Sequence, residues 1–183
     1  MLSSISHPSL SNEDAASADD LHDWLMSSRP LEWWAESAST AGGLPRWYTR
    51  LHSELLLLTT GDEVEAVFVT PNVEKFAAVV TVVSTHRLIF ARVDAEEGSD
   101  SYEAHAISRR GVRDVRVEER FGLIGRDSRR DWPGDLTVIV DVAGLAEPLR
   151  FGPSPHTTVG ARKPDMYAVL QSFLANLGAN RSL

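Results

Sequence analysis

The sequence predicts an α+β fold in which a small antiparallel β-barrel or sandwich follows a helical extension and is capped by a C-terminal helix. Apolar residues recur at helical spacing up to residue 58 and again after residue 164. Between these segments, six or seven short runs rich in β-branched residues follow one another, at a spacing of roughly 8–12 residues. Turn residues separate the runs, and no long internal repeat is visible. This order of elements is typical of a small antiparallel barrel or sandwich closed by one helix.

The helical extension is predicted over residues 13–58. Acids stand near the start of its first segment, Ser28 and a following Pro begin the second, and Gly61 ends the third. Residue types of this kind mark helix starts and stops. Residues 1–12 are Ser-rich and aperiodic and are predicted to be disordered, and residues 179–183 are predicted to be a short tail.

Residues 59–178 are predicted to form the barrel domain. The closing helix, "KPDMYAVLQSFLANLG", carries Phe173 on a broad apolar stripe and is expected to end at Gly178. We expect Phe173 to be buried against the barrel. Six or seven strands are predicted among the runs "DEVEAVFVTP", "EKFAAVVTVVST", "HRLIFARVD", "SYEAHAIS", "VRDVRVEERF", "LTVIVDV" and "LRFGP". In the fifth run, Val115 and Val117 are predicted to face inward.

The composition is that of an ordinary soluble globular protein, with 43% hydrophobic and 24% charged residues. The absence of cysteine excludes a disulfide framework, a thiol nucleophile and cysteine-ligated zinc. No apolar run approaches the roughly 20 residues that cross a bilayer. The N-terminal stretch lacks the basic and apolar regions of a secretory signal, so a cytoplasmic location is predicted.

The formal charge of −8 is distributed unevenly along the chain. Residues 1–45 hold seven acids and one base, whereas residues 105–130 hold eight arginines and four acids. The acidic total argues against nucleic-acid binding. The arginine-rich stretch is open to three interpretations: a solvated face paired with nearby acids, a docking surface for an acidic partner, or a site for an anionic small ligand or lipid. Its candidate residues are Arg109, Arg110, Arg113, Arg116 and Arg120.

Four of the five tryptophans lie in the helical extension: Trp24, Trp33, Trp34 and Trp47. Trp33 and Trp34 are sequence neighbours and point about 100° apart on a helix, so both do not enter one core stripe. We expect the helices to pack on the barrel through Trp24, Trp34 and Trp47, either within one chain or between chains, with their acids near the arginine-rich stretch. The alternative is an apolar docking surface for another subunit or protein.

His86 and Arg87 stand between two strongly β-forming runs, and we interpret them as the turn and the start of the next strand. No serine-hydrolase, metalloprotease or phosphate-cradling motif occurs in the chain. None of the six histidines pairs with another at metal-ligand spacing, although a barrel can bring His86 and His105 onto neighbouring strands. The sequence therefore predicts no catalytic residue, no metal site and no cofactor.

Three segments resemble bacterial pleckstrin-homology-like domains: "LLLLTTGDEVEAVFV", "VVTVVSTHRLIFARVD" and "AISRRGVRDVRVEE". The resemblance covers about residues 55–178 and implies a PH-like barrel, in a group of domains that often self-assemble through strand edges. The first hairpin loop, "TPNVEKF", holds only Lys75 beside Glu74. Specific phosphoinositide binding is therefore not expected, because binders of that kind place several basic residues there.

These observations lead to two hypotheses of function. The first is a non-enzymatic interaction or self-assembly module, whose partner is a second copy of the chain or another protein. The alternative is a binder of a small apolar or anionic, lipid-like ligand that uses the barrel and the arginine-rich strand.

Overall fold

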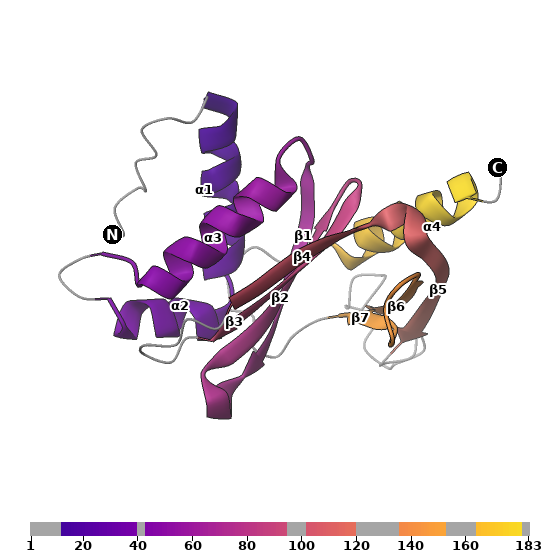
Figure 1. The fold of residues 1–183 in the computed structure, drawn as a ribbon. Helices are drawn as coiled ribbons and strands as arrows, with labels where there is room; N and C mark the ends of the chain where they lie inside the picture. The colour runs from indigo at the N-terminus through magenta and orange to yellow at the C-terminus, as the bar shows by residue number, and fades with distance from the viewer. Residues whose placement is uncertain (1–11, 40–42, 95–101, 120–135, 153–163, 181–183) are drawn as a thin grey trace, which may run out of the picture.

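The computed structural model describes residues 12–39, 43–94, 102–119, 136–152 and 164–180. Within these ranges, seven strands form two antiparallel sheets, and four α-helices accompany them (Figure 1). The predicted α+β class, with a helical extension and a closing helix, is confirmed. Among the described residues, no helix is long and apolar enough to span a membrane.

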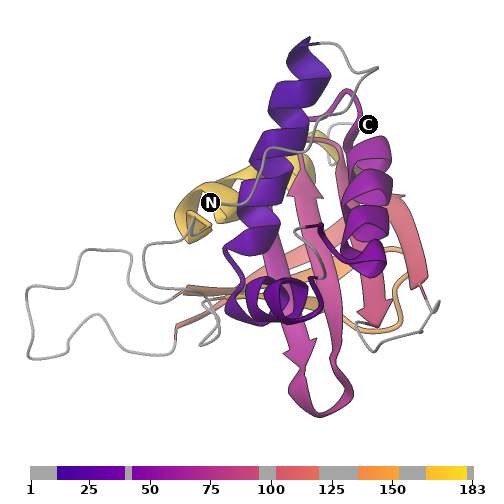
Figure 2. The same cartoon turned by 90° about the vertical axis from the view of Figure 1, so that its left-hand side faces the viewer.

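Three helices precede the strands and lie together over one face of the first sheet (Figure 2). They are α1 (Asn12–Met26), α2 (Arg29–Ser37) and α3 (Arg46–Thr59). The extended backbone of Ser28 precedes α2, and Pro30 occupies its first turn, where a missing N–H costs nothing.

The first sheet has four strands in the order β1-β2-β3-β4, each antiparallel to its neighbours. A short 3-10 turn, η1 (Val73–Lys75), joins the first two strands. The strands are β1 (Val64–Asn72), β2 (Ala77–Ser84), β3 (Arg87–Asp94) and β4 (Tyr102–Ser108).

The second sheet has three strands in the order β5-β6-β7, and it follows the first through the 3-10 turn η2 (Arg109–Gly111). Its strands are β5 (Val112–Glu119), β6 (Leu136–Val142) and β7 (Leu149–Phe151). The closing helix α4 (Met166–Asn180) packs against β5, β6 and η2. Figure 1 places this second unit on the opposite side of the first sheet from α1–α3.

The first sheet contributes buried side chains to a core on each of its faces, because its side chains alternate between the two faces. The core under α1–α3 takes alternate residues such as Val80 and Ile89, together with Leu51 and Leu55 of α3. The other core lies between the two sheets and α4. Its buried residues are Ala66, Val83, Leu88, Phe90, Val112, Val138, Val140, Val142, Phe151, Val169 and Phe173.

Two details of the predicted elements are corrected, and one is confirmed. Helix α4 continues to Asn180 instead of ending at Gly178, since a glycine within a helix costs only about 1 kcal/mol relative to alanine. Val115 and Val117 pair with Val140 and Val138, so both lie on the face of β5 that carries the second core. Val115 packs against that core, but Val117 is exposed, so the expected burial is wrong for Val117. Phe173 is fully buried, as predicted.

Candidate interaction site

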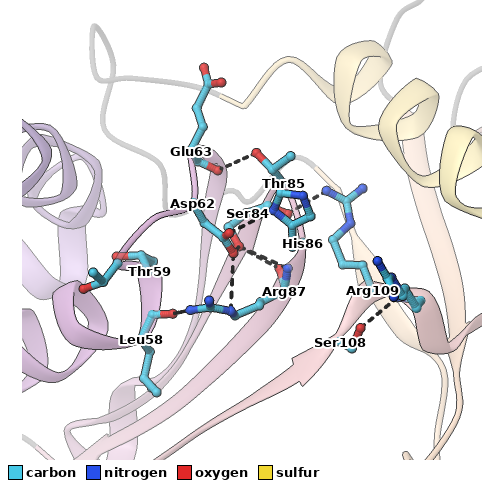
Figure 3. A network of polar contacts seen from close by, with 12 residues as sticks. Leu58, Thr59, Asp62, Glu63, Ser84, Thr85, His86, Arg87, Ser108 and Arg109 are labelled. Atoms are coloured by element: carbon cyan, nitrogen blue, oxygen red, sulfur yellow. Dashed lines mark hydrogen bonds and ion pairs between the residues drawn. The ribbon is translucent and has the colours of Figure 1, made fainter.

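A polar cluster centred on Asp62 holds the turn between β2 and β3 against the end of α3 (Figure 3). The Asp62 carboxylate is almost fully buried. It accepts a hydrogen bond from the Ser84 hydroxyl at 2.8 Å, and Nδ1 of His86 lies 2.9 Å from its other oxygen. Arg87 places Nε 3.6 Å from the same carboxylate and donates from a terminal nitrogen to the carbonyl of Leu58 at 2.7 Å. The cluster thus ties the hairpin turn to the helix that precedes the sheet.

The charge state of Asp62 follows from these contacts. Burial acts to raise the pKa of its carboxyl group, whereas the hydrogen bonds from His86 and Ser84 and the charge of Arg87 act to lower it. The lowering contributions are larger together, so the pKa lies below its ordinary value of 3.8. Asp62 is therefore ionised and bound to its donors at neutral pH.

His86 has the turn position that its sequence context indicates. Thr85 and His86 link β2 to β3, and the Thr85 N–H donates to the carbonyl of Glu63 at 3.0 Å. The His86 carbonyl accepts from the N–H of Arg109 at 2.9 Å. Sequence reasoning missed the contact with Asp62, which is 24 positions away. The Gly-Asp turn ahead of β1 is the only local signal for it.

Arg109 is fully buried and joins three elements of the fold. One terminal nitrogen donates to Glu65 on β1 at 2.9 Å and to the Ser84 carbonyl on β2 at 2.7 Å. The other donates at 2.8 Å to the hydroxyl of Ser172 on α4, which itself donates to Glu65. The guanidinium lies 4.5 Å from the centre of the Phe173 ring. Arg109 therefore acts inside the molecule and does not share a surface with the other candidate arginines.

The other candidate arginines divide between the surface and the undescribed part of the chain. Arg110, Arg113 and Arg116 are exposed along η2 and β5. Arg116 lies 3.2 Å from the carboxylate of Asp114, and this pairing agrees with a solvated, acid-paired face. Arg120 lies outside the described residues. An anionic-partner role for the exposed arginines stays a prediction.

The tryptophans separate into packed and exposed positions. Trp24 and Trp34 are buried in the core under the helices, and Trp47 packs against that core partly buried. The helices thus dock within the chain through these three side chains. The expectation that their acids lie near the arginine-rich stretch is wrong for the part of that stretch on β5, because the helices contact β1, β3 and β4, and β5 lies in the other sheet (Figure 1). The arginines of the stretch from Arg120 onward lie outside the described residues. The free energy gained by burying the apolar face of the first sheet is larger than the free energy of surface ion pairs, so burial determines where the helices lie.

Trp33 is 55% exposed and stacks on Phe76, which is 44% exposed. Their ring centres are 6.3 Å apart, at an angle of 24° between the planes. Phe76 has a φ of +46°, which a bulky side chain rarely adopts. Sequence reasoning missed Phe76, since left-handed backbone is usually marked by glycine or asparagine. The aromatic at the end of the "TPNVEKF" loop is the only signal for it.

A small aromatic cluster between α1 and α3 accounts for two further histidines. The hydroxyl of buried Tyr48 lies 2.7 Å from Nδ1 of His22, and Nε2 of His52 lies 2.8 Å from the carbonyl of Ala18. Burial, followed by the charge of Asp23, raises the pKa of Tyr48 above its ordinary value. Tyr48 is therefore a neutral phenol, and its hydrogen bond with His22 helps to hold the two helices together.

His86 and His105 do not come together into a metal site. His105 stacks on Phe90, with ring centres 5.2 Å apart, whereas His86 contacts Asp62. Over the described ranges, no group of three or more histidines and acids has the arrangement of a metal site.

No protein-family model matches the chain, and no curated protein matches it in sequence. Solved structures are similar to it, among them two from Shewanella species. The pleckstrin-homology domain from Shewanella amazonensis SB2B is 12% identical, with 78% of this chain and 96% of that chain covered and a TM-score of 0.35. A protein with a pleckstrin-homology domain from Shewanella loihica PV-4 is 13% identical, with 70% and 95% covered and a TM-score of 0.35. No residue of this chain takes a role from these similarities.

Proposed function

We propose that the chain is a non-enzymatic protein-interaction module of PH-like fold that assembles with copies of itself. The partner in this proposal is another protein chain, in the first place a second copy. The cytoplasmic location expected from the sequence stays a prediction beside it.

The proposal is supported by what the buried polar side chains do. Asp62 and Arg109 each direct their hydrogen bonds to donors and acceptors of neighbouring elements. Side chains used in this way fix the relative positions of a helix, a turn and a sheet.

The observation that carries the proposal is the outward face of α4. This helix has 15 residues and no charged side chain, in a chain with a net charge of −8. Tyr167 is 40% exposed and Leu174 is 41% exposed on it. The fully buried centre of a protein interface is depleted in charge and enriched in aromatic residues. The outward face of α4 has no charged residue and carries one aromatic residue, Tyr167.

The alternative function, binding of a small apolar or anionic ligand, receives less support. Phe151 lies 5.0 Å from Phe68 and 5.5 Å from Phe173 between ring centres, so aromatic side chains fill the space between the sheets. Arg109 is bonded to Glu65 and Ser172. Neither arrangement favours a ligand inside the barrel over a partner outside it.

Light scattering over a wide range of protein concentration tests the proposal. The mass is expected to rise from that of a 20.1 kDa monomer towards a defined multiple as the concentration increases. A strictly monomeric protein at every concentration would overturn the self-assembly proposal. Native mass spectrometry on the same samples would reveal a retained small molecule, which would favour the ligand-binding alternative instead.

A further inference from the structure

The buried side of α4 defines where its outward face is centred. Val169 and Phe173 are both buried in the second core. At 100° per residue, each lies about 160° around the helix from Gln171. Gln171 is exposed and therefore stands in the middle of the face that points away from the molecule.

The two sides of this outward face carry different side chains. Tyr167 and Leu174 lie on one side of Gln171, and Ala168 and Ala175 lie on the other. All five residues are exposed. The face therefore has two halves that run along the helix. One half carries the bulky apolar residues Tyr167 and Leu174, and the other carries the small residues Ala168 and Ala175.

Charge decides where two copies of the chain can approach each other. Each copy carries a net charge of −8, which opposes self-association. Across a two-fold axis a surface meets its own copy, so any charged residue near the axis faces the same charge. Every other described α-helix contains acidic residues, and α4 contains no charged residue from Met166 to Asn180. Of the described helices, α4 is therefore the one whose self-contact carries no like-charge repulsion.

We propose that two copies pair through α4, antiparallel, across a two-fold axis at Gln171; this inference rests on the proposed self-assembly. An antiparallel two-fold arrangement keeps each half of the face opposite the same half of the second copy. Tyr167 of each copy then contacts Leu174 of the other copy, so the two-fold axis produces this contact twice. Ala168 lies opposite Ala175 of the second copy and lets the helices approach within the usual roughly 8–10 Å. The two Gln171 amides meet at the axis, where each supplies a donor and an acceptor to the other.

Charged substitutions test this pairing and its direction. Leu174→Lys alone and Tyr167→Glu alone are each expected to raise the dimer dissociation constant by about tenfold or more, because an unpaired charge becomes buried in the contact. The double variant is expected to regain most of the affinity. Residues seven apart in one helix are not neighbours, so the two new charges meet only between copies. Circular dichroism and thermal unfolding confirm that each variant is folded.

Leu57→Lys is the matched control, since Leu57 is 72% exposed on α3. It is expected to leave the dissociation constant unchanged. The inferred pairing is wrong if either single variant associates like the parent chain. It is also wrong if the double variant associates no better than the single ones.

Disulfide trapping gives a second readout, because the chain has no cysteine of its own. Gln171→Cys places one thiol beside its symmetry mate and is expected to form a covalent dimer under mild oxidation, whereas Leu57→Cys is not. If the parent chain self-associates in light scattering but Gln171→Cys cross-links no faster than Leu57→Cys, the α4 pairing is refuted and the proposed self-assembly stands. A parent chain that is monomeric at every concentration would overturn both the α4 pairing and the proposed self-assembly.

Discussion

At the scale of single residues, the two buried charges stabilise the fold because each is met by several partners. Arg109 has lost all contact with water but bonds to a carboxylate, a carbonyl and a hydroxyl. Asp62 likewise collects a hydroxyl and an imidazole. Burying a charge costs free energy even when it is paired, and removing one partner of a buried pair costs about 3–5 kcal/mol because it leaves the other charge uncompensated.

Removing the Arg109 side chain should therefore be severe. Arg109→Ala leaves Glu65 and Ser172 without their shared donor and opens a gap beside Phe173. We expect a loss of about 3–5 kcal/mol in the free energy of unfolding, measured by urea denaturation. Arg113→Ala, at an exposed position on β5, should stay within about 0.5 kcal/mol of the parent. Similar small losses in both variants would show that the buried network contributes nothing.

The lowered pKa of Asp62 predicts how stability changes in acid. Its ionised carboxylate stabilises the folded chain at pH values above the ordinary pKa of 3.8, and this contribution is lost as the pH falls towards the lower folded-state pKa. Asp62→Asn should be less stable than the parent near neutral pH. It should also lose less stability on acidification from about pH 5 to about pH 3.

Urea denaturation across that pH range is the measurement. Asp114→Asn is the control, because the Asp114 carboxylate is more than half exposed in its contact with Arg116. A parent and an Asp62→Asn variant with parallel pH profiles would disprove the assignment of the acid-labile stability to Asp62.

At the scale of elements, α4 has two faces with different roles. Phe173 points inward and is fully buried against Phe151 and the guanidinium of Arg109. Leu174, its neighbour in sequence, is exposed. The inward face belongs to the core of one chain, so substitutions on the two faces should have separable effects on stability and association.

Phe173→Ala should cost about 3–5 kcal/mol of unfolding free energy, the usual range for a large aromatic removed from a core. Leu174→Ala is the neighbouring control and should cost much less, since its side chain is already partly in water. Chemical denaturation of both variants decides the matter. A loss below about 1 kcal/mol for Phe173→Ala would contradict its burial.

The helices and strands are predictable from sequence because the periodicity of their apolar residues is a local pattern. The contacts between helices and strands are less predictable, because they join residues that are far apart in the sequence. Ser84 and Glu65 lie 22 and 44 positions from Asp62 and Arg109, and only the fold brings each pair together. The exposure of Trp33 follows from its direct neighbour Trp34, whereas its stacking on Phe76 depends on a turn in another element. Charge patterning suggested a dock near the arginines, but apolar burial decided the position of the helices.

At the scale of the whole molecule, the helical extension and the first sheet share one core. Trp24 and Trp34 are buried in it, and at roughly 25 cal/mol per Å² their apolar area outweighs any surface ion pair. Salt screens charges but leaves apolar burial in place. The dock should therefore persist at high ionic strength.

Limited proteolysis at low and at high salt checks this expectation. Residues 20 to 58 should resist cleavage in both conditions, because their helices are covered on the side that faces the sheet. Rapid trimming to about residue 55, with a stable remainder, would instead mean that the helices detach easily from the sheet.

The first sheet has a core on each face, and the two cores are completed at different stages of translation. During synthesis, α1–α3 leave the ribosome before any strand exists to cover Trp24 and Trp34. Their partners are complete once β4 has emerged, so the N-terminal layer can close while the second sheet is still being translated. Ser172, which meets Arg109, follows only with α4. Until α4 and the second sheet have emerged, the other apolar face of the first sheet, with Leu88 and Phe90, has no cover of its own.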